Sequence, residues 1–226
     1  MCASGRAKAC RRTISPRPQR PCRSVIRKSS VSAQRPSYRW DKLLPPDVRE
    51  APTGVFFKTM DELNIAQFRS DGFTFNRLPP YTSWQEVFPE AMRLWQEYCR
   101  MAAPIRVVRV AARYINRLRF AMPVELSAFL SASPVVPEPL PQLLRGYLTR
   151  IVLTDPQTTN SVVVTQALER SAEPDHVVLL LDVDAYRDVD LEAEDDTIAA
   201  IFASLHDLKN RVFFGSITER AAEMYE

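Results

Sequence analysis

The segment 105–120 constrains the fold more than any other part of the chain, because polarity alternates along it with a two-residue period. One set of alternate positions is apolar apart from Asn116 and consists of Val108, Val110, Ala112, Tyr114, Asn116, Leu118 and Phe120. The other set carries four arginines, which are Arg109, Arg113, Arg117 and Arg119. Successive side chains of a strand point to opposite faces of a sheet, so this pattern predicts a long antiparallel strand. Its apolar side should cover a core, and its arginine side should face water or a ligand.

Charge is divided unevenly along the 226 residues. Residues 1–40 hold eleven of the 30 Lys and Arg residues and no Asp or Glu. The other 186 residues therefore carry 19 basic against 27 acidic side chains, a division that the net charge of +3 hides. A basic tail joined to an acidic body gives no nucleic-acid signature for the folded part.

Residues 1–50 are predicted to form a disordered tail. They are rich in Pro, Ser and Arg and contain no amphipathic repeat, so they cannot bury enough apolar surface to offset the entropy lost on ordering. Three interpretations of the tail stay open. It binds nucleic acid through phosphates, it is an organelle transit peptide, or it is an extension without a function.

Cysteine and histidine are too few for the common disulfide and zinc frameworks. Cys2, Cys10 and Cys22 lie in the tail, which leaves Cys99 alone in the body, and the chain has two histidines. We therefore expect no disulfide framework, no zinc site of the Cys/His type and no cofactor. No apolar run approaches the roughly 18 residues needed to span a bilayer, and no apolar segment near the start resembles a secretory signal. The sequence predicts a cytoplasmic protein without a membrane partner.

The body divides into two parts, 51–104 and 105–226, each predicted to contain a sheet segment and a helix. The first part starts with three short strands, at 53–59, 64–70 and 72–78. A long amphipathic helix then begins at the capping box formed by Ser83 and Glu86. Pro89 should kink this helix or separate its first turn.

The second part is predicted to continue from the arginine-bearing segment through a short helix and three strands, at 124–130, 147–154, 161–168 and 177–186. Acidic residues 188–196 should form a loop. A long helix should start near Asp195 or Asp196 and end at Gly215, after which Ser216 and Glu219 should cap a last short helix.

Four motifs in the body resemble one protein family. They are GFTFNRLPPYTSW (72–84), RYIN (113–116), LLLDVDAY (179–186) and DLKNRVFFGSIT (207–218). They are similar to a sporadically distributed bacterial family of uncharacterised proteins, and the resemblance covers roughly residues 53–226. It implies a bacterial, cytoplasmic setting and carries over no catalytic residue.

Members of that family begin with an extended apolar strand and a helix, a place that the basic tail takes here. The difference predicts a sheet that lacks one strand and exposes an unpaired edge. The order of elements otherwise predicts a duplicated unit, because each part runs through strands into a long helix. The expected fold class is α+β, with antiparallel sheets that wrap long helices, similar to helix-grip or TATA-binding-protein-like folds. Such a likeness licenses no function.

The candidate binding residues belong to the arginine-bearing segment and are Arg109, Arg113, Asn116, Arg117 and Arg119. Arginine suits an anionic or protein ligand because its planar donors bind carboxylate or phosphate in a bidentate manner. Asn116 is polar on an apolar side and must be hydrogen-bonded if it is buried. It either bonds neighbouring backbone at a bulge or lines a cavity.

Asp182 and Asp184 are the only candidates for a metal site in the sequence, and they are weak candidates. Their carboxylates share one face of a predicted strand, about 6.5 Å apart, and could hold Mg²⁺ or Mn²⁺ or act as acid and base. The simpler interpretation is that they form cross-strand ion pairs with arginines of the segment 105–120.

These features predict a non-catalytic binding module, whose arginine-bearing face or exposed edge receives another protein or an anionic ligand. The alternative is a nucleic-acid binder that uses the basic tail together with the same face. A metal-dependent hydrolase that uses Asp182 and Asp184 comes third. The chain has neither a nucleophile elbow nor a glycine-rich phosphate loop, so an enzyme is not the first expectation.

Overall fold

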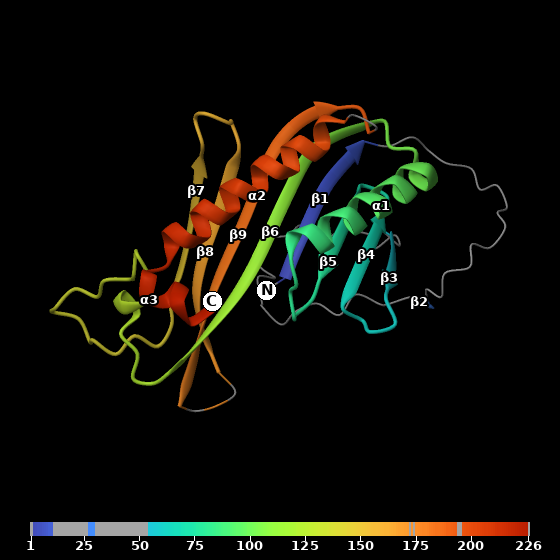
Figure 1. The fold of residues 1–226 in the computed structure, drawn as a ribbon. Helices are drawn as coiled ribbons and strands as arrows, with labels where there is room; N and C mark the ends of the chain where they lie inside the picture. The colour runs from blue at the N-terminus through green and yellow to red at the C-terminus, as the bar shows by residue number, and fades with distance from the viewer. Residues whose placement is uncertain are drawn as a thin grey trace, which may run out of the picture.

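The computed structural model describes residues 2–10, 27–29, 54–171, 173, 175–193 and 196–225. Nine strands within these ranges form one antiparallel sheet in the order β2-β3-β4-β5-β1-β6-β9-β8-β7 (Figure 1). The strands are β1 (Cys2–Cys10), β2 (Arg27–Ser29), β3 (Gly54–Lys58), β4 (Asn64–Arg69), β5 (Gly72–Arg77), β6 (Arg106–Ala121), β7 (Leu148–Thr154), β8 (Ser161–Arg170) and β9 (His176–Leu191).

Two long helices, α1 (Trp84–Ala102) and α2 (Thr197–Ser216), lie on one face of this sheet (Figure 1). Short helical turns complete the described chain: η1 (Leu126–Ala128), α3 (Glu219–Ala222) and η2 (Glu223–Tyr225). One core joins the sheet to both helices, because Tyr98 of α1, Leu205 of α2 and Val110 of β6 are buried in the same cluster. The predicted α+β class with an antiparallel sheet is confirmed.

The strand order repeats outward from the central pair β1–β6. On one side the order is β1, β5, β4, β3, with β2 added at the edge, and on the other side it is β6, β9, β8, β7. Each set of strands is followed in the chain by a long helix on the same face of the sheet. This symmetry is the arrangement that a duplicated unit should have.

Strand β1, which belongs to the predicted tail, lies between β5 and β6. It pairs antiparallel with both neighbours, so the expectation that the tail supplies no strand and leaves the sheet with an unpaired edge in its place is wrong. A ladder needs backbone N–H and C=O groups rather than apolar side chains, and β1 contains no proline. The structure describes 2–10 and 27–29 of the predicted tail as strands, whereas residue 1 and residues 11–26 and 30–50 of that tail lie outside the described residues.

Strand β6 has the predicted two-face pattern, with one departure near its start. Tyr114, Leu118 and Phe120 are at most 4% exposed, while Arg117 and Arg119 are exposed. The register of β6 against β9 shifts between residues 107 and 109, which marks a β-bulge. Val107 is consequently buried and Val108 is exposed, opposite to the prediction.

Several element boundaries differ from those predicted. Strand β9 continues to Leu191 through the expected acidic loop, because this acidic stretch faces arginines of β6. Helix α2 includes Gly215, and the cap of α3 is Thr218 rather than Ser216, whose Oγ donates to the carbonyl of Val212. Helix α1 runs without interruption through Pro89, so no first turn is separated.

Candidate functional site

We call the arginine face the side of the sheet formed by Arg106, by the odd-numbered residues of β6 from Arg109 onward, and by their neighbours on β9, β8 and β7. It is the side of the sheet that the described helices leave uncovered (Figure 1). Five arginines of β6 form ion pairs along it: Arg106–Asp190, Arg109–Asp188, Arg113–Asp182, Arg117–Glu169 and Arg119–Glu173. The face therefore presents alternating opposite charges rather than an excess of positive charge.

Arg113 and Asp182 form the most enclosed of these pairs. Arg113 Nε donates to Asp182 Oδ1 at 2.8 Å and to Oδ2 at 3.1 Å, and Arg113 Nη2 also donates to Oδ2. The Asp182 side chain is 11% exposed, so water screens this pair less than the pairs at the rim. The interpretation of Asp182 as a cross-strand ion-pair partner is confirmed.

Asp184 stands opposite Arg113 in the β6–β9 ladder, on the same face as Asp182, and it too has an interaction partner. Within the described ranges no three His, Cys, Asp or Glu side chains are grouped as a metal site would require. Because Arg113 donates to both carboxylate oxygens of Asp182, a cation at this place would lie beside a guanidinium group and be repelled by it.

The carboxylates that pair with the remaining candidate arginines are more exposed than Asp182. The guanidinium of Arg109 sits 3.5 Å from the centroid of the Tyr186 ring, in cation–π geometry, and its Nη1 lies 3.3 Å from Asp188 Oδ1. Arg117 Nη2 lies 2.8 Å from Glu169 Oε2 and its side chain is 63% exposed. Arg117 and Arg119 are therefore the arginines that an incoming partner would meet first.

Asn116 is not part of the arginine face. It points to the helix-covered side, is 4% exposed, and its Nδ2 donates to the carbonyl of Leu181 at 3.1 Å. The first interpretation, a bond to neighbouring backbone, is the one observed, but the bulge lies at 107–109 instead. The Asn116 Oδ1 atom has no hydrogen-bond partner within the described structure. The predicted set of binding residues is thus divided between two faces of the sheet.

Sequence reasoning missed the exposure of β7. Among the described strands, β7 pairs only with β8, at one end of the sheet, and all seven of its residues are exposed. Its apolar side chains are Leu148, Ile151, Val152 and Leu153, at 59%, 52%, 53% and 49% exposure. The run Ile151–Leu153 breaks the alternation of a half-buried strand, which is the signal that could have marked it.

A buried lysine on α2 was also missed. Lys209 is 7% exposed, and its Nζ lies 3.7 Å from the centroid of the Tyr114 ring. Burial lowers the pKa of Lys209 to about 8. Burial raises the pKa of Tyr114, whose hydroxyl lies 3.1 Å from that of Tyr81. Burial likewise lowers the pKa of His206, which stacks on Trp84.

No family model, curated protein or solved structure matches this chain. The resemblance to the bacterial family consequently stays a prediction, and the candidate site depends on its geometry. Among the described helices, none has the length and apolar character to cross a membrane.

Proposed function

We propose that the chain is a non-catalytic interaction module. It binds a protein partner along the arginine face and along β7, the strand at one edge of the sheet. The observation that carries the proposal is the exposure of β7, where four large apolar side chains face solvent within seven residues. Edge strands of monomeric proteins are usually short, charged or covered, since an uncovered edge pairs with other chains. A partner that adds an extended segment to β7 would cover both its backbone and its side chains.

The register of the sheet makes β7 continuous with the arginine face. Asp182 of β9 stands opposite Thr165 of β8, which stands opposite Arg150 of β7. Arg150 is exposed and forms no ion pair with any described residue. A carboxylate on the partner would complement it, and Val152 on the same face would supply apolar contact. Arginine and apolar side chains together are characteristic of protein interfaces.

The ion pairs favour a protein over an anionic ligand. A phosphate-rich ligand gains affinity where cations lack carboxylate partners, whereas five arginines of β6 already have them. The arginines and carboxylates of these pairs can form new ion pairs with charged side chains of a partner protein, and the net charge of the interface then changes little. Because the motifs of the body resemble a bacterial protein family, the proposed setting is the cytoplasm of a bacterium.

Nucleic-acid binding is the second candidate, and the composition of residues 1–40 favours it. Eleven Lys and Arg residues without Asp or Glu would bind phosphates in any extended conformation. A metal-dependent hydrolase that uses Asp182 and Asp184 has less support, because Arg113 donates to both oxygens of Asp182.

Site-specific photo-crosslinking in the cell distinguishes these candidates. A photo-reactive residue is placed at Val152 or at Arg117, and as a matched control at Met101, which is also exposed but lies at the end of α1. We expect one and the same protein to be cross-linked at Val152 and Arg117 and to be absent at Met101. Equal labelling at all three positions, or recovery of nucleic acid alone with loss at high salt, would contradict the proposal.

A further inference from the structure

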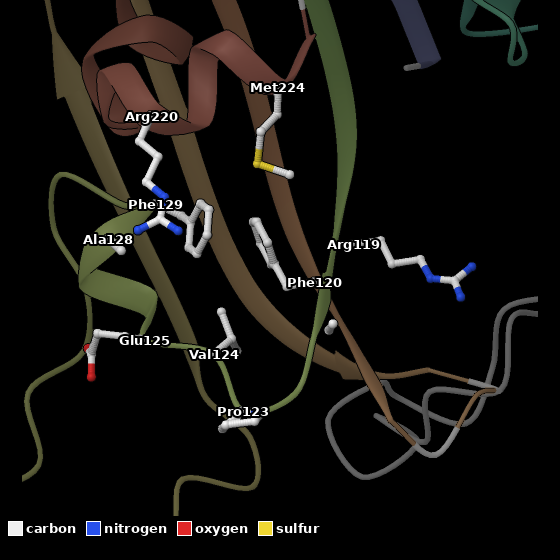
Figure 2. Close-up of a pocket in the computed structure, with 10 residues that line it drawn as sticks. Arg119, Phe120, Pro123, Val124, Glu125, Ala128, Phe129, Arg220 and Met224 are labelled. Carbon is white, nitrogen blue, oxygen red and sulfur yellow. The ribbon is translucent and has the colours of Figure 1, made fainter.

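A pocket of about 340 Å³ lies beyond the end of β6, away from the arginine face (Figure 2). Its lining comes from three parts of the chain: the last residues of β6, the segment through η1, and the C-terminal turns α3 and η2. The lining residues include Phe120, Val124, Ala128, Phe129, Arg220 and Met224.

Hydrogen bonds hold the two walls of the pocket together. The backbone N–H of Thr218 donates to the carbonyl of Phe129 at 3.1 Å, and Thr218 Oγ1 donates to the carbonyl of Ala128 at 2.7 Å. Ser131 Oγ also donates to the carbonyl of Ile217 at 3.0 Å. The wall that carries Phe129 and the wall that carries Arg220 are therefore positioned before any ligand arrives, as is usual for small-molecule sites.

The floor of the pocket is apolar. Phe120 is 4% exposed, and its ring centroid lies 4.3 Å from that of Phe129. The side chain of Met224 extends toward these two rings, and Val124 lies on the opposite side (Figure 2). A flexible thioether beside two rings can adapt to an aromatic or branched group.

One cation is directed at this floor. The guanidinium of Arg220 lies 5.0 Å from the centroid of the Phe129 ring, and no carboxylate of the described residues forms an ion pair with it. Arg119 extends away from the pocket and pairs with Glu173 (Figure 2). Glu125 points outward and accepts a hydrogen bond from Ser127 Oγ at 2.8 Å. The pocket thus presents a single guanidinium above an apolar floor.

We propose that this pocket binds a small monocarboxylate with an aromatic or branched apolar body. The carboxylate would accept two parallel hydrogen bonds from Arg220, the geometry in which guanidinium and carboxylate match. The body would lie against Phe120, Phe129 and Met224. A volume of about 340 Å³ is at the small end of the range for ligand sites, and one guanidinium matches one singly charged head group. The inference is independent of partner binding at the arginine face.

Calorimetric titration of the full chain with a matched pair of probes tests this proposal. The probes are 3-phenylpropanoate and its neutral amide, 3-phenylpropanamide, which have nearly the same shape. We expect the carboxylate to bind at least about tenfold more tightly than the amide, as a charge-assisted hydrogen bond predicts. Equal affinity of the two probes, or no binding of the carboxylate at millimolar concentration, would overturn the proposal without any variant being made.

Two variants locate the binding. Arg220→Gln should lower the affinity for the carboxylate probe to that for the amide. Arg145→Gln, which removes an exposed arginine outside the pocket, should leave the affinity for the carboxylate probe unchanged. Ala128→Phe should fill the pocket and weaken both probes. Thermal unfolding midpoints close to that of the unaltered chain establish that the variants fold. Unchanged carboxylate binding in Arg220→Gln, or in Ala128→Phe, would show that the probe binds elsewhere.

Discussion

Lys209 places an ammonium group in the interface between α2 and β6, above the ring of Tyr114. A side chain of this type is rarely buried without a carboxylate, and among the described residues none forms an ion pair with it. The favourable contact with the ring offsets only part of the desolvation, since cation–π contacts contribute about 1–2 kcal/mol when they are buried. The charged form of Lys209 therefore destabilises the fold.

Replacing Lys209 by methionine should stabilise the protein at pH 7, by about 1–3 kcal/mol. A pKa near 8 lies well below the usual value of 10.5, and each unit corresponds to about 1.4 kcal/mol. The loss of the contact with Tyr114 reduces the gain. Urea unfolding of the two proteins at pH 7 measures the difference.

The same pKa predicts how stability depends on pH. Between pH 8 and 10 the unfolded chain keeps the Lys209 proton while the folded chain has lost it. Stability of the unaltered protein should therefore rise over this interval, and the gain should be missing in Lys209→Met. A parallel pH dependence in both proteins would show that Lys209 is not the cause.

At the scale of single elements, β7 differs from the adjacent strand β8. Strand β8 is covered by its neighbours and holds the buried residues Val162 and Val164, whereas β7 exposes every side chain. Burial of its apolar residues contributes little to folding, because roughly half of each side chain surface stays in water. The strand is retained by its ladder to β8, and its side chains are available to a partner.

Val152→Lys should consequently separate folding from binding. We expect the free energy of unfolding to change by no more than about 0.5 kcal/mol, as for other exposed positions, while cross-linking from Arg117 to the partner is lost. Val164→Lys, a change on β8 at a residue 4% exposed, is the control that should unfold the protein. A loss of several kcal/mol in Val152→Lys would instead mean that β7 is part of the core.

The whole molecule depends on β1, which joins two otherwise separate sets of strands. It pairs with β5 over six residue pairs and with β6 over nine, so among the described strands all backbone pairing between the two halves of the sheet passes through it. Its removal would leave two central edges without hydrogen-bond partners. The two helices would still pack together through Phe88 and Phe202.

Deletion of residues 1–10 should therefore destabilise the protein by several kcal/mol and favour aggregation. The expected signs are a lower unfolding midpoint and a larger hydrodynamic radius on size-exclusion chromatography. Replacing Arg6 and Lys8 by Gln keeps the backbone ladder and serves as the control for lost charge. If the deletion left the unfolding midpoint unchanged, β1 would have no role in the sheet.

Local patterns along the chain were sufficient for most elements of the fold. The alternation in 105–120 identified β6 and its two faces, and the capping box located the start of α1 at Ser83, which accepts a hydrogen bond from the N–H of Glu86 at 3.2 Å. These features depend on neighbours within a few residues, so the sequence by itself determines them. The duplicated order of strands and helices belongs to the same class of information.

Contacts between distant residues were decided only by the tertiary structure. Arg113 meets Asp182 across 69 positions of sequence, and Lys209 meets Tyr114 from another element. The end of β9 was mistaken for a loop because its aspartates are strand residues only when arginines of β6 face them. Periodicity shows which side of a strand is polar, but the identity of a partner depends on strand order and register. Those are set by the packing of the whole sheet, which a local pattern does not contain.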